Sequence, residues 1–245
     1  MILQGRLARL LVLDFGTFEV RGGERVIGIP GFLMETDRGQ RILFDTGFPP
    51  DYATNPDRPA QDGLPRFGRL IDFSATQTAE GALALLGLAP SDIDLVILSH
   101  SHIDHVGSLP LFAHAPIVMT ARERAEPKPL YFGQARPIDW PDAGYRPIDA
   151  DTPVCDGLTL IPTPGHTAGH LSALANLPDG RSVILAADAI NRMSEPSEGF
   201  ADADDPAAAQ GSADYLLSLA PPDAHLIYGH EPTQWPLLPK APLSW

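Results

Sequence analysis

The sequence is poor in cysteine, in positive charge and in long apolar runs, and each shortage excludes a class of protein. Cys155 is the one cysteine, so no internal disulfide can form and nothing indicates an oxidising compartment. The 17 basic residues stand against 31 acidic ones, and the net charge of −14 would repel nucleic-acid phosphates and anionic lipid headgroups. No apolar run reaches the roughly 18 residues that a membrane-spanning helix needs.

The N-terminal stretch MILQGRLARLLVLDFG does not have the pattern of a signal peptide. Arg6, Arg9 and Asp14 interrupt its apolar residues, and no small-residue cleavage site follows. We therefore expect a cytoplasmic protein that binds neither nucleic acid nor membranes.

A hydrophobic content of 44% in 245 residues is enough for a substantial core. Short apolar runs bounded by Gly and Asp in the first 46 residues predict antiparallel strands and hairpins. Residues 77–87 and 205–220 have helical patterns, and 116–120 reads as a strand. The segments 157–170, 181–190 and 224–232 each contain a strand that ends on a histidine or aspartate. Because strands and helices mix throughout without a low-complexity linker, we expect a single α/β domain over residues 1–245.

Two stretches, 48–70 and 127–147, have many prolines and no periodicity, which predicts long irregular loops. Loops of this length inside a compact domain are often functional, so we expect lid or pocket elements. The 48–70 loop would serve equally well as the contact of a homodimer.

The histidines are concentrated in ILSHSHIDHVG at residues 97–107. Three of the chain's eight histidines, His100, His102 and His105, lie here within six residues, together with Asp104. The apolar run before them predicts a strand that ends at the cluster, and a loop at a strand end suits chelation better than a helix. Neutral imidazole and carboxylate are good ligands for zinc, and similar sites accept iron, manganese or cobalt.

Three further residues occur where an apolar strand meets a loop: His166 in TPGHTAGH, Asp188 in LAADAI and His230 in IYGH. Four ligands from one loop would crowd a single ion and would leave these strand ends unexplained. Two ions resolve both problems, so we expect a dinuclear centre.

In these motifs the chain resembles the metallo-β-lactamase superfamily, and among its branches most closely the N-acyl homoserine lactonases. The matching segments are LFDTG at 43–47, SHSHIDH at 99–105, TPGHTAGH at 163–170, Asp188, and YGH at 228–230. The resemblance implies an αββα sandwich of two mixed β-sheets flanked by helices, with the metal centre at one edge.

The resemblance also implies roles for individual residues. His100, His102 and His166 would bind one metal ion, Asp104, His105 and His230 the other, and Asp188 would bridge them. Asp45 would accept a hydrogen bond from a ligand imidazole, and His170 would be structural or lie just outside the ligands. His114 and His225 are expected to be ordinary polar residues.

A dinuclear centre can hold a hydroxide, polarise a substrate carbonyl and stabilise the expelled alkoxide. Asp104 is the candidate to relay a proton to that alkoxide, with simple ligation as the equal alternative. Ring opening of a lactone by this hydroxide fits the chemistry, and N-acyl homoserine lactones are the expected substrates. Other lactones, aryl esters and organophosphates are the alternatives, and an iron-binding redox protein is the alternative from another class.

One departure concerns the substrate. The homoserine lactonases carry a tyrosine three residues after the bridging aspartate, and Asn191 occupies that position here. An asparagine amide can also donate a hydrogen bond, but it is shorter. The predicted pocket residues from the irregular loops are aromatic: Phe48, Phe67, Tyr131, Phe132, Trp140 and Tyr145.

Overall fold

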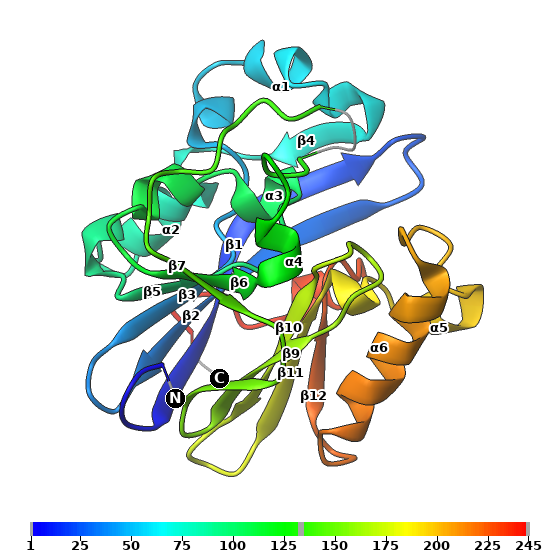
Figure 1. Cartoon of the computed structure of the whole chain (residues 1–245). Helices are drawn as coiled ribbons and strands as arrows, with labels where there is room; N and C mark the ends of the chain where they lie inside the picture. The colour runs from blue at the N-terminus through cyan, green and yellow to red at the C-terminus, as the bar shows by residue number, and fades with distance from the viewer. Residues whose placement is uncertain (1, 132–134, 244–245) are drawn as a thin grey trace.

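Two β-sheets packed face to face form the centre of the computed structural model, which describes residues 2–131 and 135–243 (Figure 1). In the larger sheet the strand order is β4-β1-β2-β3-β5-β6-β7. The bounds are β1 Leu7–Val20, β2 Val26–Thr36, β3 Arg41–Phe44, β4 Gly68–Asp72, β5 Leu95–Ile97, β6 Ile117–Thr120 and β7 Tyr145–Ile148. As the sequence predicted, β1, β2 and β3 pair antiparallel, and β3, β5, β6 and β7 then continue the sheet in parallel.

The smaller sheet has the order β12-β11-β10-β9-β8. Its strands are β8 Thr152–Cys155, β9 Leu158–Pro162, β10 Leu171–Asn176, β11 Ser182–Ala187 and β12 His225–Tyr228. The pairing is antiparallel from β8 to β11, and β12 adds in parallel to β11. Both sheets are therefore mixed.

Helices cover the outer faces of the two sheets (Figure 1). The α-helices are α1 Arg58–Gln61, α2 Ala79–Ala84, α3 Ile103–Val106, α4 Ala121–Arg124, α5 Glu195–Glu198 and α6 Pro206–Ser218. Short 3₁₀ turns are η1 Pro50–Ala53, η2 Leu64–Arg66, η3 Ala75–Gln77, η4 Pro90–Asp92, η5 Leu109–Phe112, η6 Asp188–Ile190 and η7 Trp235–Leu237. Among the described residues, no helix combines the length and apolarity required to cross a bilayer.

Strand β1 shows how the layers are encoded. Leu10 and Val12 point into the core between the sheets, whereas Leu11 and Leu13 point into the core under α2 and α3. This follows from the period of two in a strand, and it requires apolar residues on both faces because both faces are covered.

The longest helix, α6, covers the other sheet. It begins where the Asp205 side chain accepts a hydrogen bond from the Ala208 N–H and Pro206 occupies the first helical position. Ala209, Ala213 and Leu216 then recur at helical spacing and pack on the smaller sheet. With helices outside both sheets, the predicted αββα sandwich is confirmed.

Two details differ from the sequence-based expectations. The 48–70 stretch is not structureless, since it holds η1, α1, η2 and the start of β4. The histidine cluster is only partly a loop, because Asp104 and His105 lie on the single-turn helix α3. A turn that short brings both side chains toward the same edge, so the cluster still converges. The single-domain organisation and the lid role of the loop stay predictions.

Candidate metal centre

The predicted ligands all follow strands that end at one edge of the sandwich. His100 comes shortly after β5, Asp188 directly after β11, and His230 shortly after β12. Parallel strands present their carboxyl ends at a common edge, and β9, which precedes His166, runs in the same direction as β11. The larger sheet therefore supplies one part of the site and the smaller sheet the other.

The side chains form two donor groups. The ligand atoms of His100, His102, His166 and Asp188 all lie within 4.8 Å of one another, and so do those of Asp104, His105 and His230. We call His100, His102 and His166 the first donor group, and Asp104, His105 and His230 the second.

Asp188 lies between the two donor groups and offers one oxygen to each. Its Oδ2 is 3.2 Å from His166 Nε2 and 3.8 Å from His100 Nε2. Its Oδ1 is 3.4 Å from the Nε2 atoms of both His105 and His230. A carboxylate divided in this way can ligate two cations at once.

Hydrogen bonds outside the site fix which ring nitrogens face inward. The Ser99 hydroxyl donates to Asp45 Oδ2, so its contact of 3.1 Å with His100 Nδ1 requires that Nδ1 be the donor. His105 Nδ1 donates to Asp45 Oδ2 at 2.8 Å, and His230 Nδ1 donates to the Gly28 carbonyl at 2.9 Å. All three rings therefore turn Nε2 toward the centre, where it can bind a metal ion once it carries no proton.

These inward atoms lack partners of their own. Within the part of the chain that the structure describes, His100 Nε2, His105 Nε2 and Asp188 Oδ1 are buried and make no hydrogen bond. Buried polar atoms without partners are rare because each costs free energy. Imidazole nitrogens and carboxylate oxygens that converge without hydrogen-bond partners are suitable ligands for a pair of divalent cations.

The electrostatics of the metal-free site point the same way. Burial alone would lower the pKa of His105, but Asp104, Asp188 and Asp45 raise it to about 10. Burial would raise the pKa of Asp104, yet His105 and His230 lower it to about 2. The carboxylates therefore hold a proton on His105 where a metal ion would otherwise bind.

His170 differs from the ligands because both of its ring nitrogens are occupied. Nε2 accepts the Asp188 backbone N–H at 3.1 Å, and Nδ1 lies 2.8 Å from Thr163 Oγ1. The Thr163 and Ser172 hydroxyls continue the chain to the Ala186 carbonyl. His170 therefore orients the backbone of Asp188 and offers no free nitrogen to an ion.

The backbone at the site is held in uncommon conformations. Ala187, directly before Asp188, has φ of +45°, and Asp45 has φ of +63°, both rare for residues other than glycine. At Gly229 a Cβ atom would lie 2.6 Å from the Ala187 carbonyl oxygen and 2.7 Å from Asp188 Oδ1. The glycine before His230 is thus required by the close approach of the β11 end.

A cavity of about 120 Å³ opens beside His230. Its lining residues are Val20, Arg25, Ile27, Asn191, Arg192, Asp202 and His230. Asn191 is only 8% exposed, and its Oδ1 has no hydrogen-bond partner within the described ranges. Asn191 therefore places a mostly buried amide at the edge of the cavity, next to the second donor group.

The predicted aromatic pocket residues that the structure describes do not line this cavity. Phe48 and Tyr131 are enclosed in the core, and the Tyr131 hydroxyl donates to Asp62. Trp140 and Tyr145 pack against each other beneath the Arg124 guanidinium. Phe67 is 42% exposed beside β4, and Phe132 lies outside the described residues. Among the predicted pocket residues within 2–131 and 135–243, Asn191 alone lines the cavity beside His230.

Sequence reasoning missed Glu123, which is 1% exposed at the start of α4 and contacts both ligand loops. The available signal was the T-x-x-E pattern of Thr120 and Glu123, which is typical of a helix N-terminus. Thr120 does accept the Glu123 N–H. The Glu123 carboxylate, however, turns away from its own helix and toward the site.

Comparison with known proteins agrees with this geometry. Residues 29–230 match the Metallo-beta-lactamase superfamily. The chain is 30% identical to N-acyl homoserine lactonase AttM of Azorhizobium caulinodans, over 90% of this chain and 88% of the relative. It is also 30% identical to N-acyl homoserine lactonase AiiA of Bacillus thuringiensis subsp. kurstaki, over 82% of this chain and 80% of that protein.

Solved structures share the fold. An N-acyl homoserine lactone hydrolase with the product N-hexanoyl-L-homoserine at its catalytic metal center superimposes with a TM-score of 0.83 at 23% identity. That match covers 98% of this chain and all of the other. A dizinc quorum-quenching lactonase, AidC, gives a TM-score of 0.61 at 21% identity, covering 89% and 78% of the two chains. Fold, motif positions and sequence similarity agree that this chain belongs to the metallo-beta-lactamase superfamily.

Proposed function

We propose that this protein is a dinuclear metal-dependent hydrolase that opens the lactone ring of N-acyl homoserine lactones, the chemistry of quorum quenching. The observation that carries the proposal is Asp188, whose two oxygens divide between two converging donor groups with bare nitrogens. The relatives named above are N-acyl homoserine lactonases, which supports this substrate class.

The two donor groups would hold two divalent cations, and zinc suits their imidazole and carboxylate atoms. Such a pair of ions supplies a hydroxide nucleophile at neutral pH and polarises the substrate carbonyl. The protein's own contribution is to fix the ligands: Asp45 and Ser99 set the tautomers of His105 and His100, and His170 orients Asp188.

Asp104 is the residue that we assign to proton transfer. Its side chain is 15% exposed, against 6% for Asp188 and 2% for Asp45, so it is the carboxylate of the site most open to water. Its Oδ2 lies 3.3 Å from His230 Nε2, at the boundary of the second donor group. From there the carboxylate could take the proton of the hydroxide that adds to the carbonyl and pass it to the alkoxide that ring opening releases.

Asn191 is the residue that we assign to substrate orientation. Its buried amide lines the cavity beside His230, and its backbone carbonyl accepts the His230 N–H at 2.9 Å. The same residue thus connects the cavity to the second donor group. We place the enzyme in the cytoplasm, where its buried, unpaired Cys155 suits reducing conditions.

The test combines metal analysis with a ring-opening assay. We expect two zinc-like ions per chain and acid release from homoserine lactones of several acyl lengths, both lost in His105→Ala. His114→Ala, which changes a histidine outside the site, is the matched control. Unchanged hydrolysis in His105→Ala would contradict the mechanism. One iron per chain with visible absorption would favour the redox alternative, and hydrolysis of aryl esters or phosphotriesters alone would redirect the substrate assignment.

A further inference from the structure

We propose that Glu123 is a positioning residue that sets the affinity of the first donor group for its ion. It would do so by clamping together the two loops that carry these ligands. This inference rests on the proposed metal centre and concerns a residue that is not itself a ligand.

The clamp consists of three hydrogen bonds to one buried carboxylate. Glu123 Oε1 accepts the Ser101 backbone N–H at 2.9 Å and the Ser101 hydroxyl at 2.6 Å. Oε2 accepts the Thr167 hydroxyl at 2.9 Å. Ser101 lies between His100 and His102, and Thr167 follows His166, so the contacts fall on both loops of the first donor group.

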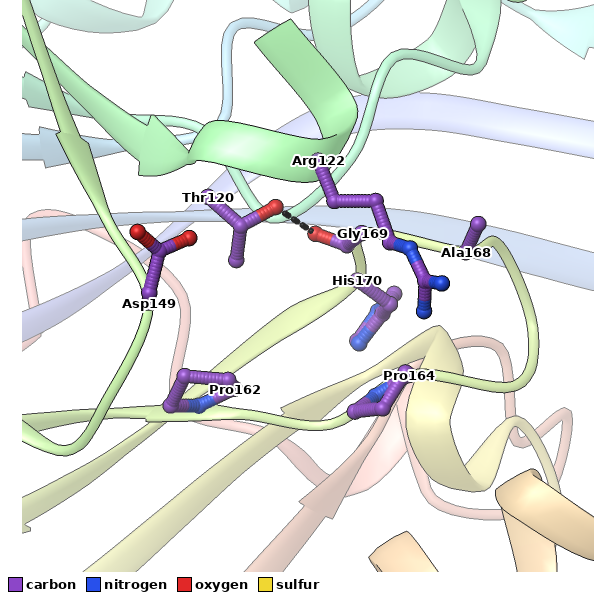
Figure 2. A pocket seen from close by; sticks show the side chains of 8 residues that line it. All are labelled: Thr120, Arg122, Asp149, Pro162, Pro164, Ala168, Gly169 and His170. Atoms are coloured by element: carbon purple, nitrogen blue, oxygen red, sulfur yellow. Dashed lines mark hydrogen bonds between the residues drawn. The ribbon is translucent and has the colours of Figure 1, made fainter. Parts of the chain in front are cut away.

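The loop of His166 also docks on α4 through its backbone. The Thr120 hydroxyl donates to the Gly169 carbonyl, as Figure 2 shows. A Cβ atom at Gly169 would lie only 2.3 Å from the Glu123 backbone nitrogen. Close docking of this kind allows the Glu123 side chain to reach Thr167.

The first donor group depends on this clamp more than the second does. In the second group, the His105 ring donates a hydrogen bond to Asp45, and the His230 ring donates one to the Gly28 carbonyl. In the first group, the polar contacts of the His102 and His166 rings among the described residues stay within the site. His102 Nδ1 lies 3.1 Å from His166 Nε2, which in turn lies 3.2 Å from Asp188 Oδ2. Their placement is therefore determined by their backbones, which Glu123 holds.

The chemistry of Glu123 suits this role. A buried carboxylate is costly unless hydrogen bonds satisfy it, and three donors do so here. Removing the side chain would leave Ser101 and Thr167 without their acceptor and free the two loops to separate. Residues that orient metal ligands typically change metal affinity by about 10-fold to 100-fold when mutated.

The experiment titrates a chromophoric chelator against zinc-loaded protein and counts the zinc released at each chelator concentration. We expect Glu123→Ala to lose one of two zinc ions at a chelator concentration about tenfold lower than wild type. The other ion should leave as in wild type. Glu123→Gln should stay near wild type, because its amide oxygen can accept from Ser101 while its NH₂ donates to a reoriented Thr167 hydroxyl.

Two further variants complete the design. Glu126→Ala is the matched control, since Glu126 lies one turn along the chain and pairs with Arg136 instead. Thr167→Val removes one bond of the clamp with little change in shape, so it tests the proposal even if Glu123→Ala does not fold. We expect Thr167→Val to weaken the same ion, and to add nothing in the Glu123→Ala background.

Retention of both ions in Glu123→Ala and Thr167→Val, or equal loss of both, would overturn the proposal. Independent, multiplying effects in the double variant would do the same. A wild type that binds two zinc ions and opens lactones leaves the proposed function intact in each of these cases.

Discussion

The His105 imidazole donates through Nδ1 to Asp45 Oδ2 across 2.8 Å, and neither side chain is more than 2% exposed. The Ser99 N–H and hydroxyl donate to the same carboxylate at 2.7 Å each. Three donors thus converge on the Asp45 carboxylate. No neutral side chain of the same size could accept all three hydrogen bonds equally well.

Asp45→Asn is expected to weaken metal binding and hydrolysis by about 10-fold to 100-fold. The amide retains one acceptor oxygen, and its NH₂ group must face a donor from Ser99 or His105. Zinc content after dialysis and kcat/KM are the two measurements. The control is Asp37→Asn, on the exposed turn after β2, and equal behaviour of the two variants would refute the role of Asp45.

The stability of the metal-free protein should depend on pH through His105. The pKa of His105 is about 10 in the folded chain and about 6.5 in the unfolded chain. Protonated His105 therefore makes its full contribution to the free energy of unfolding below pH 6.5. That contribution is lost as the pH rises through 10. We expect the Tm of the chelated protein to fall between pH 7 and pH 10, whereas in the zinc-loaded protein the ion replaces this proton. Parallel curves for both forms would contradict the assignment.

Gly229→Ala should abolish most activity because the added methyl group has no space. It would lie 2.6 Å from the Ala187 carbonyl oxygen and 2.7 Å from Asp188 Oδ1, so Asp188 or His230 must move. Gly211→Ala on α6 is the control, since a Cβ atom there meets nothing within 4 Å and should stabilise the helix by about 0.5–1 kcal/mol. Zinc content, thermal unfolding and hydrolysis distinguish the two variants.

Asn191→Ala should lower kcat/KM for acyl homoserine lactones by about fivefold, the effect of one neutral hydrogen bond worth about 1 kcal/mol. Met193→Ala, at a side chain 64% exposed two residues further on, is the control. Asn191→Tyr, which introduces the residue of the lactonases, should raise turnover. Unchanged kinetics in both variants would remove Asn191 from substrate recognition.

The residues of the two donor groups could be predicted because the signal for each lies in the few residues around it. Histidines and aspartates directly after apolar runs must emerge at strand ends, and strands of like direction bring those ends to one edge. The alternating burial of β1 and the N-cap and apolar face of α6 could also be predicted, because each depends on residues that are close in sequence.

What the sequence did not predict depends on contacts between distant segments. Nothing near Tyr131 indicates that its hydroxyl meets Asp62, 69 residues away, and so belongs to the core. Glu123 meets Thr167 across 44 residues, with only a helix-start pattern at its own position. Composition alone places the aromatic residues of the irregular loops at the pocket, but composition does not specify the direction of a side chain.

The donor groups draw on both sheets, with His100 to His105 at the end of the larger one and His166, Asp188 and His230 at the ends of the smaller one. Cations bound there would fasten the two halves of the sandwich at their rim. A newly made chain that has not acquired its ions would lack these links, would keep only protein hydrogen bonds and packing at that rim, and would be more open to proteolysis. Supply of the metal would thereby govern how long the protein survives as well as whether it works.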